Sequence, residues 1–161
     1  MSHAGKWRWK ISSRLEAESA NRGKLLAGAI QLITRIYEEN PYVNAIILTQ
    51  PQNIMAFGAS NARLDVRIIP ESWFFLRDVP RMEFGNQYYQ IETIAKMFTP
   101  ETPAILVEND SIIVTGNKLL QTFDRLEIAE FTARSIIMGH PLGELLTMSQ
   151  DQIDEMTRIF G

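Results

Sequence analysis

The stretch Pro103-Ala-Ile-Leu-Val-Glu-Asn-Asp-Ser-Ile-Ile-Val-Thr-Gly116 contains two short apolar runs separated by polar residues. The runs Ala104–Val107 and Ser111–Val114 have the length and the β-branched content of buried strands. Between them, Asn109 and Asp110 are residue types that tolerate the backbone angles of tight turns. The stretch therefore predicts two neighbouring strands joined by a β-hairpin or a sharp corner.

The residues that follow predict the longest helix of the chain, over 117–138. The apolar residues that we expect along one face of this helix are Leu119, Phe123, Leu126, Ala133 and Ile137. Gly139 and Pro141 then end the helix, because glycine suits a helix C-terminus and proline cannot continue one. A last helix is expected to begin at Ser149-Gln-Asp-Gln152, which has the pattern of a capping box.

Upstream, alternating helical and strand patterns precede the hairpin. We expect helices over 16–37, 53–57 and 90–98, and strands over 45–48 and 66–69. Asn40-Pro41 is expected to stop the first helix, and Gly58 the second. This order predicts an α/β or α+β layered domain. In it, Ala45–Leu48 should share one sheet with the two strands of the hairpin.

Composition limits the classes of protein to consider. The 161 residues (18.4 kDa) fit one domain over 1–161. Since the chain has no cysteine and its only histidines are His3 and His140, one chain has neither a thiolate zinc site nor a three-histidine site. The net charge of −3 disfavours general nucleic-acid binding. The sequence shows no apolar run long enough for a membrane span and no signal peptide, so we expect a cytoplasmic protein without membrane contact.

Two local features stand out. Residues 1–15 form a basic N-terminal arm in which Trp7-Arg8-Trp9-Lys10-Ile11 alternates with period two, as in an edge strand. The alternative is that this arm contacts nucleic acid or a membrane surface, with bases stacked on its two tryptophans. The segment 71–78 concentrates aromatic residues, which indicates core packing or a subunit contact more than a cofactor site. We expect self-association through Trp73-Phe74-Phe75.

Three stretches, in the same order and at similar spacing, resemble the class II aldolase/adducin family. The first is Ile36-Tyr-Glu-Glu-Asn-Pro-Tyr-Val-Asn-Ala-Ile-Ile-Leu-Thr-Gln50, similar to the family's Ile-Tyr helix end followed by Val-Asn-Ala-Val-Val-His-Thr-His. The second is Asp78-Val-Pro80 with Phe84-Gly85. The third is Pro103–Gly116, similar to the family's Leu-Glu-Asn-His-Gly-Val-Val-Val-Thr-Gly, with the helix after it. The resemblance covers roughly residues 20–140.

The resemblance implies a particular fold and chemistry. The implied fold is an α/β/α layered sandwich around a mainly antiparallel sheet, commonly assembled as a homotetramer. In L-fuculose-phosphate aldolase and similar enzymes, three histidines hold a zinc ion that polarises the substrate carbonyl, and a glutamate moves the adjacent proton.

At each of these chemical positions the sequence departs from the family. Leu48 and Gln50 occupy the positions of the His-x-His pair, and Asp110 occupies the position of the third histidine. The catalytic glutamate falls on Ala29, or on Arg22 if the first helix is longer by two turns. Zinc requires at least three good protein ligands, and this set offers at most one, so we expect no zinc at this site. Asp110 with Glu108 or water could hold a hard cation, but a turn-forming role suits it better.

Family members usually carry about 60 or more further N-terminal residues, including a phosphate-binding loop that residues 1–20 do not match. We therefore expect either a fragment or a naturally short member. The leading hypothesis is a class II aldolase/adducin-like domain that has lost zinc-dependent chemistry and serves binding or assembly. The alternative is a carbon–carbon lyase that acts on a sugar phosphate or a related small carbonyl compound. It would use non-standard ligands or residues from another chain, and stoichiometric divalent metal would distinguish it.

Overall fold

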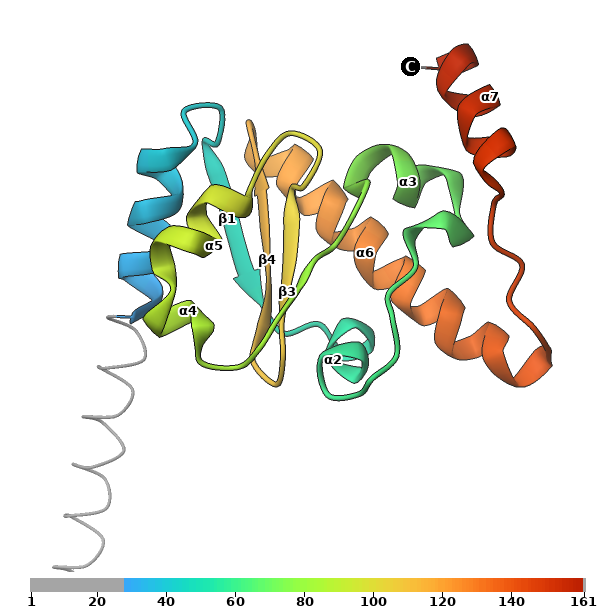
Figure 1. Ribbon diagram of the computed structural model, residues 1–161, viewed down its shortest axis with the longest axis horizontal. Coiled ribbons are helices and arrows are strands. Elements are labelled where there is room, and N and C mark those ends of the chain that lie inside the picture. The colour runs from blue at the N-terminus through green and yellow to red at the C-terminus, as the bar shows by residue number, and fades with distance from the viewer. Residues whose placement is uncertain (1–27, 161) are drawn as a thin grey trace, which may run out of the picture.

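The computed structural model describes residues 28–160, and its centre is a four-stranded sheet (Figure 1). The strands are β1 (Ala45–Thr49), β2 (Arg81–Met82), β3 (Ala104–Val107) and β4 (Ser111–Gly116), in the spatial order β1-β4-β3-β2. The three expected strands therefore do share one sheet. Their pairings are antiparallel, but β2, which the sequence pattern did not reveal, pairs parallel to β3 and makes the sheet mixed.

The turn between β3 and β4 has the geometry expected from its composition. Asn109 adopts a φ of 53°, and the Asp110 amide donates to the Val107 carbonyl over 3.3 Å. Asparagine is one of the few residues other than glycine that adopts this left-handed conformation readily. The predicted hairpin is confirmed.

The side chains of β3 and β4 are buried on both faces of the sheet. Because side chains alternate along a strand, Ala104, Leu106, Ile112 and Val114 join one core cluster, whereas Ile105, Val107 and Ile113 join another. A strand that is buried on both faces appears in the sequence as a continuous apolar run, as the two runs of the hairpin do.

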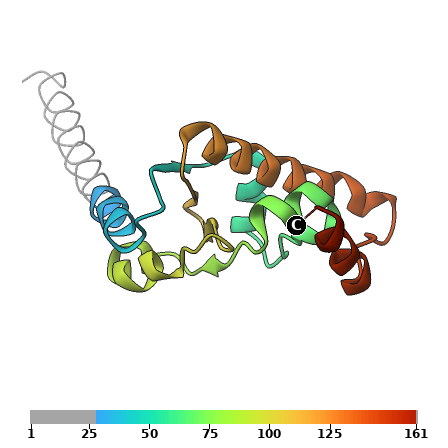
Figure 2. The same ribbon diagram turned by 90° about the horizontal axis from the view of Figure 1, so that it is seen from above.

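Helices cover both faces and complete the α/β/α sandwich (Figure 2). The first cluster is closed by α2 (Gln52–Gly58), α3 (Pro70–Leu76) and α6 (Leu119–Gly139). The second is closed by the helix over 28–39 and by α5 (Ile91–Met97), next to the short α4 (Asn86–Tyr89). The strand predicted at 7–11 lies outside the described residues.

The strand predicted at Val66–Ile69 is wrong. Residues Val66–Ile68 form a 3₁₀ turn, because the Asp65 carboxylate accepts a hydrogen bond from the Arg67 amide over 2.9 Å and caps the turn. The guanidinium of Arg67 also bonds to this carboxylate and lowers the pKa of Asp65. Only Ile69 is extended, as expected for a residue that precedes proline.

The buried face of α6 also differs from the prediction. The buried residues of this helix are Thr122, Ala129, Thr132, Ala133 and Ile136. In contrast, Leu119, Phe123 and Ile137 are exposed. Small residues and threonines face the sheet because α6 lies close against it, and Thr122 and Thr132 satisfy their hydroxyls with backbone carbonyls one turn earlier.

Asn40 links the end of the helix over 28–39 to α5 by hydrogen bonds. Its buried amide donates to the Ile36 carbonyl over 2.9 Å and to the Ala95 carbonyl over 2.8 Å. We expect Asn40→Ala to reduce the free energy of unfolding by about 2 kcal/mol, because two buried carbonyls each lose a donor. Urea denaturation monitored by circular dichroism measures this loss, with the exposed Asn61→Ala as a control expected within about 0.5 kcal/mol of the parent.

At the C-terminus, a loop leads from the end of α6 back to α7 (Gln150–Phe160), which lies beside α3 (Figure 1). It begins with the predicted capping box: the Ser149 amide donates to the Gln152 side chain over 2.9 Å, and the Gln152 amide donates to the Ser149 hydroxyl over 3.3 Å. Phe160 packs edge-on against Phe74, with 6.4 Å between ring centroids. No helix within residues 28–160 is both long and apolar enough to cross a membrane.

The aromatic segment of α3 is less exposed than the sequence suggested. Trp73 and Phe74 are partly buried, and the guanidinium of Arg77 lies 5.5 Å and 5.6 Å from the centroids of their rings. Of these three aromatic residues, only Phe75 is largely exposed. Cation–π contacts and α7 therefore cover much of the surface that was expected to drive self-association.

Candidate functional site

A cavity of about 290 Å³ opens at the end of the sheet where β1 finishes and β4 begins. It lies on the face covered by the helix over 28–39 and by α4. Its walls are apolar along the sheet and the helix and polar at the turn, and are formed by Ala29, Leu32, Leu48, Gln50, Gln87, Tyr88, Asp110, Ser111 and Ile113.

Four of the five candidate positions from the sequence meet at this cavity: Ala29, Leu48, Gln50 and Asp110. The fifth, Arg22, lies outside the described residues. Leu48 and Gln50 are two residues apart at the end of β1 and so face the same side of the sheet. The Gln50 amide donates to the backbone carbonyl of Asp110 over 2.5 Å, which joins the end of β1 to the β3–β4 turn.

The three positions that match the family's zinc ligands are chemically unlike ligands. Leu48 has no donor atom, and the Gln50 amide nitrogen is engaged with the Asp110 carbonyl. The Asp110 carboxylate accepts a hydrogen bond from the Ser111 hydroxyl over 2.7 Å, as in an ordinary polar turn. Zinc sites in proteins need three or four imidazole, thiolate or carboxylate ligands. These residues therefore do not fit a zinc ion, and within residues 28–160 no other group of three such side chains is close enough to hold a metal.

Five further residues of the cavity were not identified from the sequence, and three of them carry polar groups: Gln87, Tyr88 and Ser111. Tyr88 packs against the helix backbone at Gly28, where an added Cβ would lie 2.7 Å from the tyrosine ring. A glycine at position 28 is therefore what allows α4 to approach the helix this closely. The only available signal was the Gly85-Asn86 pair. It indicated a turn followed by the start of a helix, but it did not indicate that this helix lies close to β1.

Gln87 has an incompletely satisfied amide. Its Oε1 accepts from the Gly85 amide over 2.7 Å, which fixes the side chain. Its Nε2 is buried and has no hydrogen-bond partner among the residues that the structure describes, although Gln87 is only 5% exposed. An unsatisfied buried amide is costly, so its retention beside a cavity favours a ligand with an acceptor oxygen.

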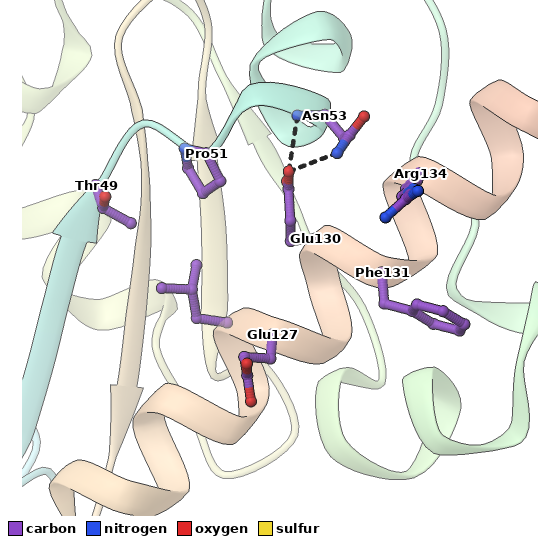
Figure 3. A pocket seen from close by; sticks show the side chains of 8 residues that line it. Thr49, Pro51, Asn53, Glu127, Glu130, Phe131 and Arg134 are labelled. Carbon is purple, nitrogen blue, oxygen red and sulfur yellow. Dashed lines mark hydrogen bonds between the residues drawn. The ribbon is translucent and has the colours of Figure 1, made fainter.

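A second hollow, of about 440 Å³, lies on the opposite face of the sheet, between α6 and the start of α2 (Figure 3). The Glu130 carboxylate accepts hydrogen bonds here from the backbone amides of Asn53 and Ile54, over 2.9 Å and 3.0 Å. Pro51, which precedes α2, has no side-chain group that could cap the helix. The Glu130 carboxylate from α6 therefore serves as the N-terminal cap. This carboxylate is therefore structural and is not available as a general base.

Residues 15–137 match the model of the family described as class II aldolase and adducin N-terminal domain. The chain belongs to this family. Among curated proteins, a sequence search found no match.

Solved structures with this fold include YgbL of Klebsiella pneumoniae, a candidate aldolase, epimerase or decarboxylase. It is 23% identical to this chain, with a TM-score of 0.69 over 80% of this chain and 64% of YgbL. An aldolase II superfamily protein from Pseudomonas syringae is 14% identical, with a TM-score of 0.69 over 84% of this chain and 56% of its own. For L-fuculose 1-phosphate aldolase from Glaciozyma antarctica the identity is 16% and the TM-score 0.67, over 83% and 51%. This chain spans less than two thirds of each of these proteins.

Proposed function

We propose that this chain is a cytoplasmic class II aldolase/adducin-like domain that has lost zinc-dependent aldolase chemistry and serves binding or assembly. The observation that carries the proposal is the donor set of the cavity: Leu48, Gln50 and Asp110 converge there, yet they supply at most one metal ligand. The position that matches the family's base falls on Ala29, which adds only a methyl group to the cavity, or on Arg22, and neither is a carboxylate. Aldol cleavage needs an electrophile to polarise the carbonyl and a base to move a proton. The cavity has no three-ligand metal site to supply the first, and no carboxylate stands at either position that matches the family's base.

What remains in the cavity suits binding of a small carbonyl compound or sugar phosphate. Leu48, Leu32 and Ile113 provide apolar contact, and the Gln87 amide is a buried donor without a partner among the described residues. A carbonyl or hydroxyl oxygen that accepted from Gln87 Nε2 would satisfy it. Small-molecule sites commonly combine an apolar wall with a few such polar groups.

The alternative is a carbon–carbon lyase on the same scaffold, favoured by the sugar-phosphate and fuculose-phosphate aldolases among the structural neighbours. It would take ligands or a base from another chain, or from sequence beyond the 51–64% of the neighbours' length that this chain covers.

Metal content separates the two proposals. We expect the full chain, loaded with zinc or manganese and then desalted, to retain far less than one metal per chain by mass spectrometry, since a single carboxylate leaves a cation mostly hydrated. We also expect no cleavage of L-fuculose 1-phosphate. Equimolar metal that is lost in Asp110→Ala but kept in Asp124→Ala, an exposed aspartate on α6, would contradict the proposal and favour the lyase.

A further inference from the structure

The outer side of α6 carries an apolar stripe where a surface helix usually carries charges. The stripe consists of Leu120, Phe123, Glu127, Phe131, Arg134 and Met138, which at about 100° per residue lie within roughly 80° of one another. Its four apolar side chains are 46–71% exposed. It lies opposite the buried residues of the helix. Figure 2 shows α6 as an outer layer of the molecule.

The two charged residues of the stripe have no ion-pair partner among the described residues. Glu127 and Arg134 take part in none of the salt bridges there, whereas the neighbouring Glu130 is committed to the start of α2. Glu127 and Arg134 are seven residues apart, or about 10.5 Å along the helix. They therefore cannot form a direct pair with each other within one chain.

The stripe is self-complementary in an antiparallel arrangement. If a two-fold axis passes between residues 130 and 131, Glu127 of each copy lies opposite Arg134 of the other, and Phe123 lies opposite Met138. Both charged residues of the stripe then meet their opposites, Phe123 and Met138 meet each other, and the two copies of Phe131 flank the axis. An isologous contact requires this kind of self-complementarity. In a parallel arrangement in register, by contrast, like charges would face each other.

The hollow between α6 and the start of α2 lies beside the stripe, at the level of the proposed axis along α6. Its lining includes Glu127, Glu130, Phe131 and Arg134, and Figure 3 shows these residues together with the end of β1. The Phe131 side chain, 61% exposed, lies next to the proposed axis. The phenyl ring of the second copy would therefore face an open space of about 440 Å³.

We propose that the partner of the α6 stripe is a second copy of this chain, bound antiparallel about a two-fold axis between residues 130 and 131. This inference rests on the assembly role proposed above and names its surface. One pair of 21-residue helices is a small contact compared with the roughly 1,200–2,000 Å² of stable interfaces. We therefore expect a reversible dimer with a micromolar dissociation constant.

Charge reversal tests both the surface and the direction of the helices. Sedimentation equilibrium of the full chain should show a monomer–dimer equilibrium. Glu127→Arg or Arg134→Glu alone should weaken the dimer at least tenfold, because each places like charges opposite each other twice. The double variant should restore it to within about threefold. An equimolar mixture of the two single variants should form heterodimers, since both pairs across the axis are then of opposite charge.

Glu144→Arg, an equal change of charge at an exposed position outside α6, is the matched control and should leave the dissociation constant unchanged. Phe131→Asp should abolish the dimer at every accessible concentration. A monomeric parent protein at high micromolar concentration would overturn the proposal, as would association that is indifferent to Phe131→Asp or mixed single variants that fail to associate. The substitutions on α6 lie on the opposite face of the sheet from the cavity, so a failed dimer test leaves the metal-content test independent.

Discussion

The combined substitutions Leu48→His, Gln50→His and Asp110→His are expected to create a zinc site in a cavity whose native side chains do not provide one. Positions 48 and 50 face the same side at the end of β1, and the hydrogen bond from the Gln50 side chain to the Asp110 backbone places the β3–β4 turn beside them. Three imidazoles with one water would complete a tetrahedral zinc shell. We expect a dissociation constant in the micromolar range or below, against no measurable binding by the parent, by isothermal titration calorimetry.

The control for this prediction is the pair Leu48→His and Gln50→His without the third histidine, which should bind at least tenfold more weakly. Zinc should also raise the melting temperature of the triple variant but not that of the parent, because a ligand that binds the folded state stabilises it. Restored binding should not restore aldol cleavage while position 29 is alanine. A triple variant that binds no better than the pair would show that these positions do not surround one site.

Glu130→Ala is expected to cause one of the largest losses of stability available from a single polar substitution in this chain. The carboxylate accepts from the Asn53 amide, the Ile54 amide and the Asn53 side chain, the last over 2.6 Å (Figure 3). Hydrogen bonds to a charged group contribute about 1.5–3 kcal/mol each and are not additive. We expect a loss of about 3 kcal/mol in the free energy of unfolding, measured by urea denaturation.

Glu127→Ala is the matched control, because Glu127 is an exposed glutamate on the same helix with no salt bridge among the described residues. At protein concentrations low enough to keep the chain monomeric, it should change the free energy of unfolding by less than about 0.5 kcal/mol. Glu130→Gln, which keeps one acceptor oxygen, should fall between the two. Equal stability of Glu130→Ala and Glu127→Ala would show that α2 does not depend on this cap.

The sequence was informative about the site positions but not about their surroundings. The resemblance placed Leu48, Gln50 and Asp110 from their order along the chain, and the fold brings them to one cavity. Gln87 and Tyr88 were missed because their place beside β1 depends on how α4 packs against Gly28, which local spacing does not encode. The role of Glu130 was missed for the same reason, because this residue of α6 caps the start of α2, and local spacing does not encode a contact between two helices.

What the sequence by itself determined are the features that arise from neighbouring residues. The hairpin of β3 and β4, the turn at Asn109 and the capping box at Ser149 were all predicted. Short continuous apolar runs, left-handed backbone preference and reciprocal capping each act over a few residues. The tertiary structure alone decided which face of α6 is buried, that Val66–Ile68 turns instead of extending, and that β2 joins the sheet. Each of these three features depends on which other parts of the chain pack against the segment. An apolar residue such as Phe123 or Phe131 marks a surface to be covered, but whether the sheet or another chain covers it is settled only by packing.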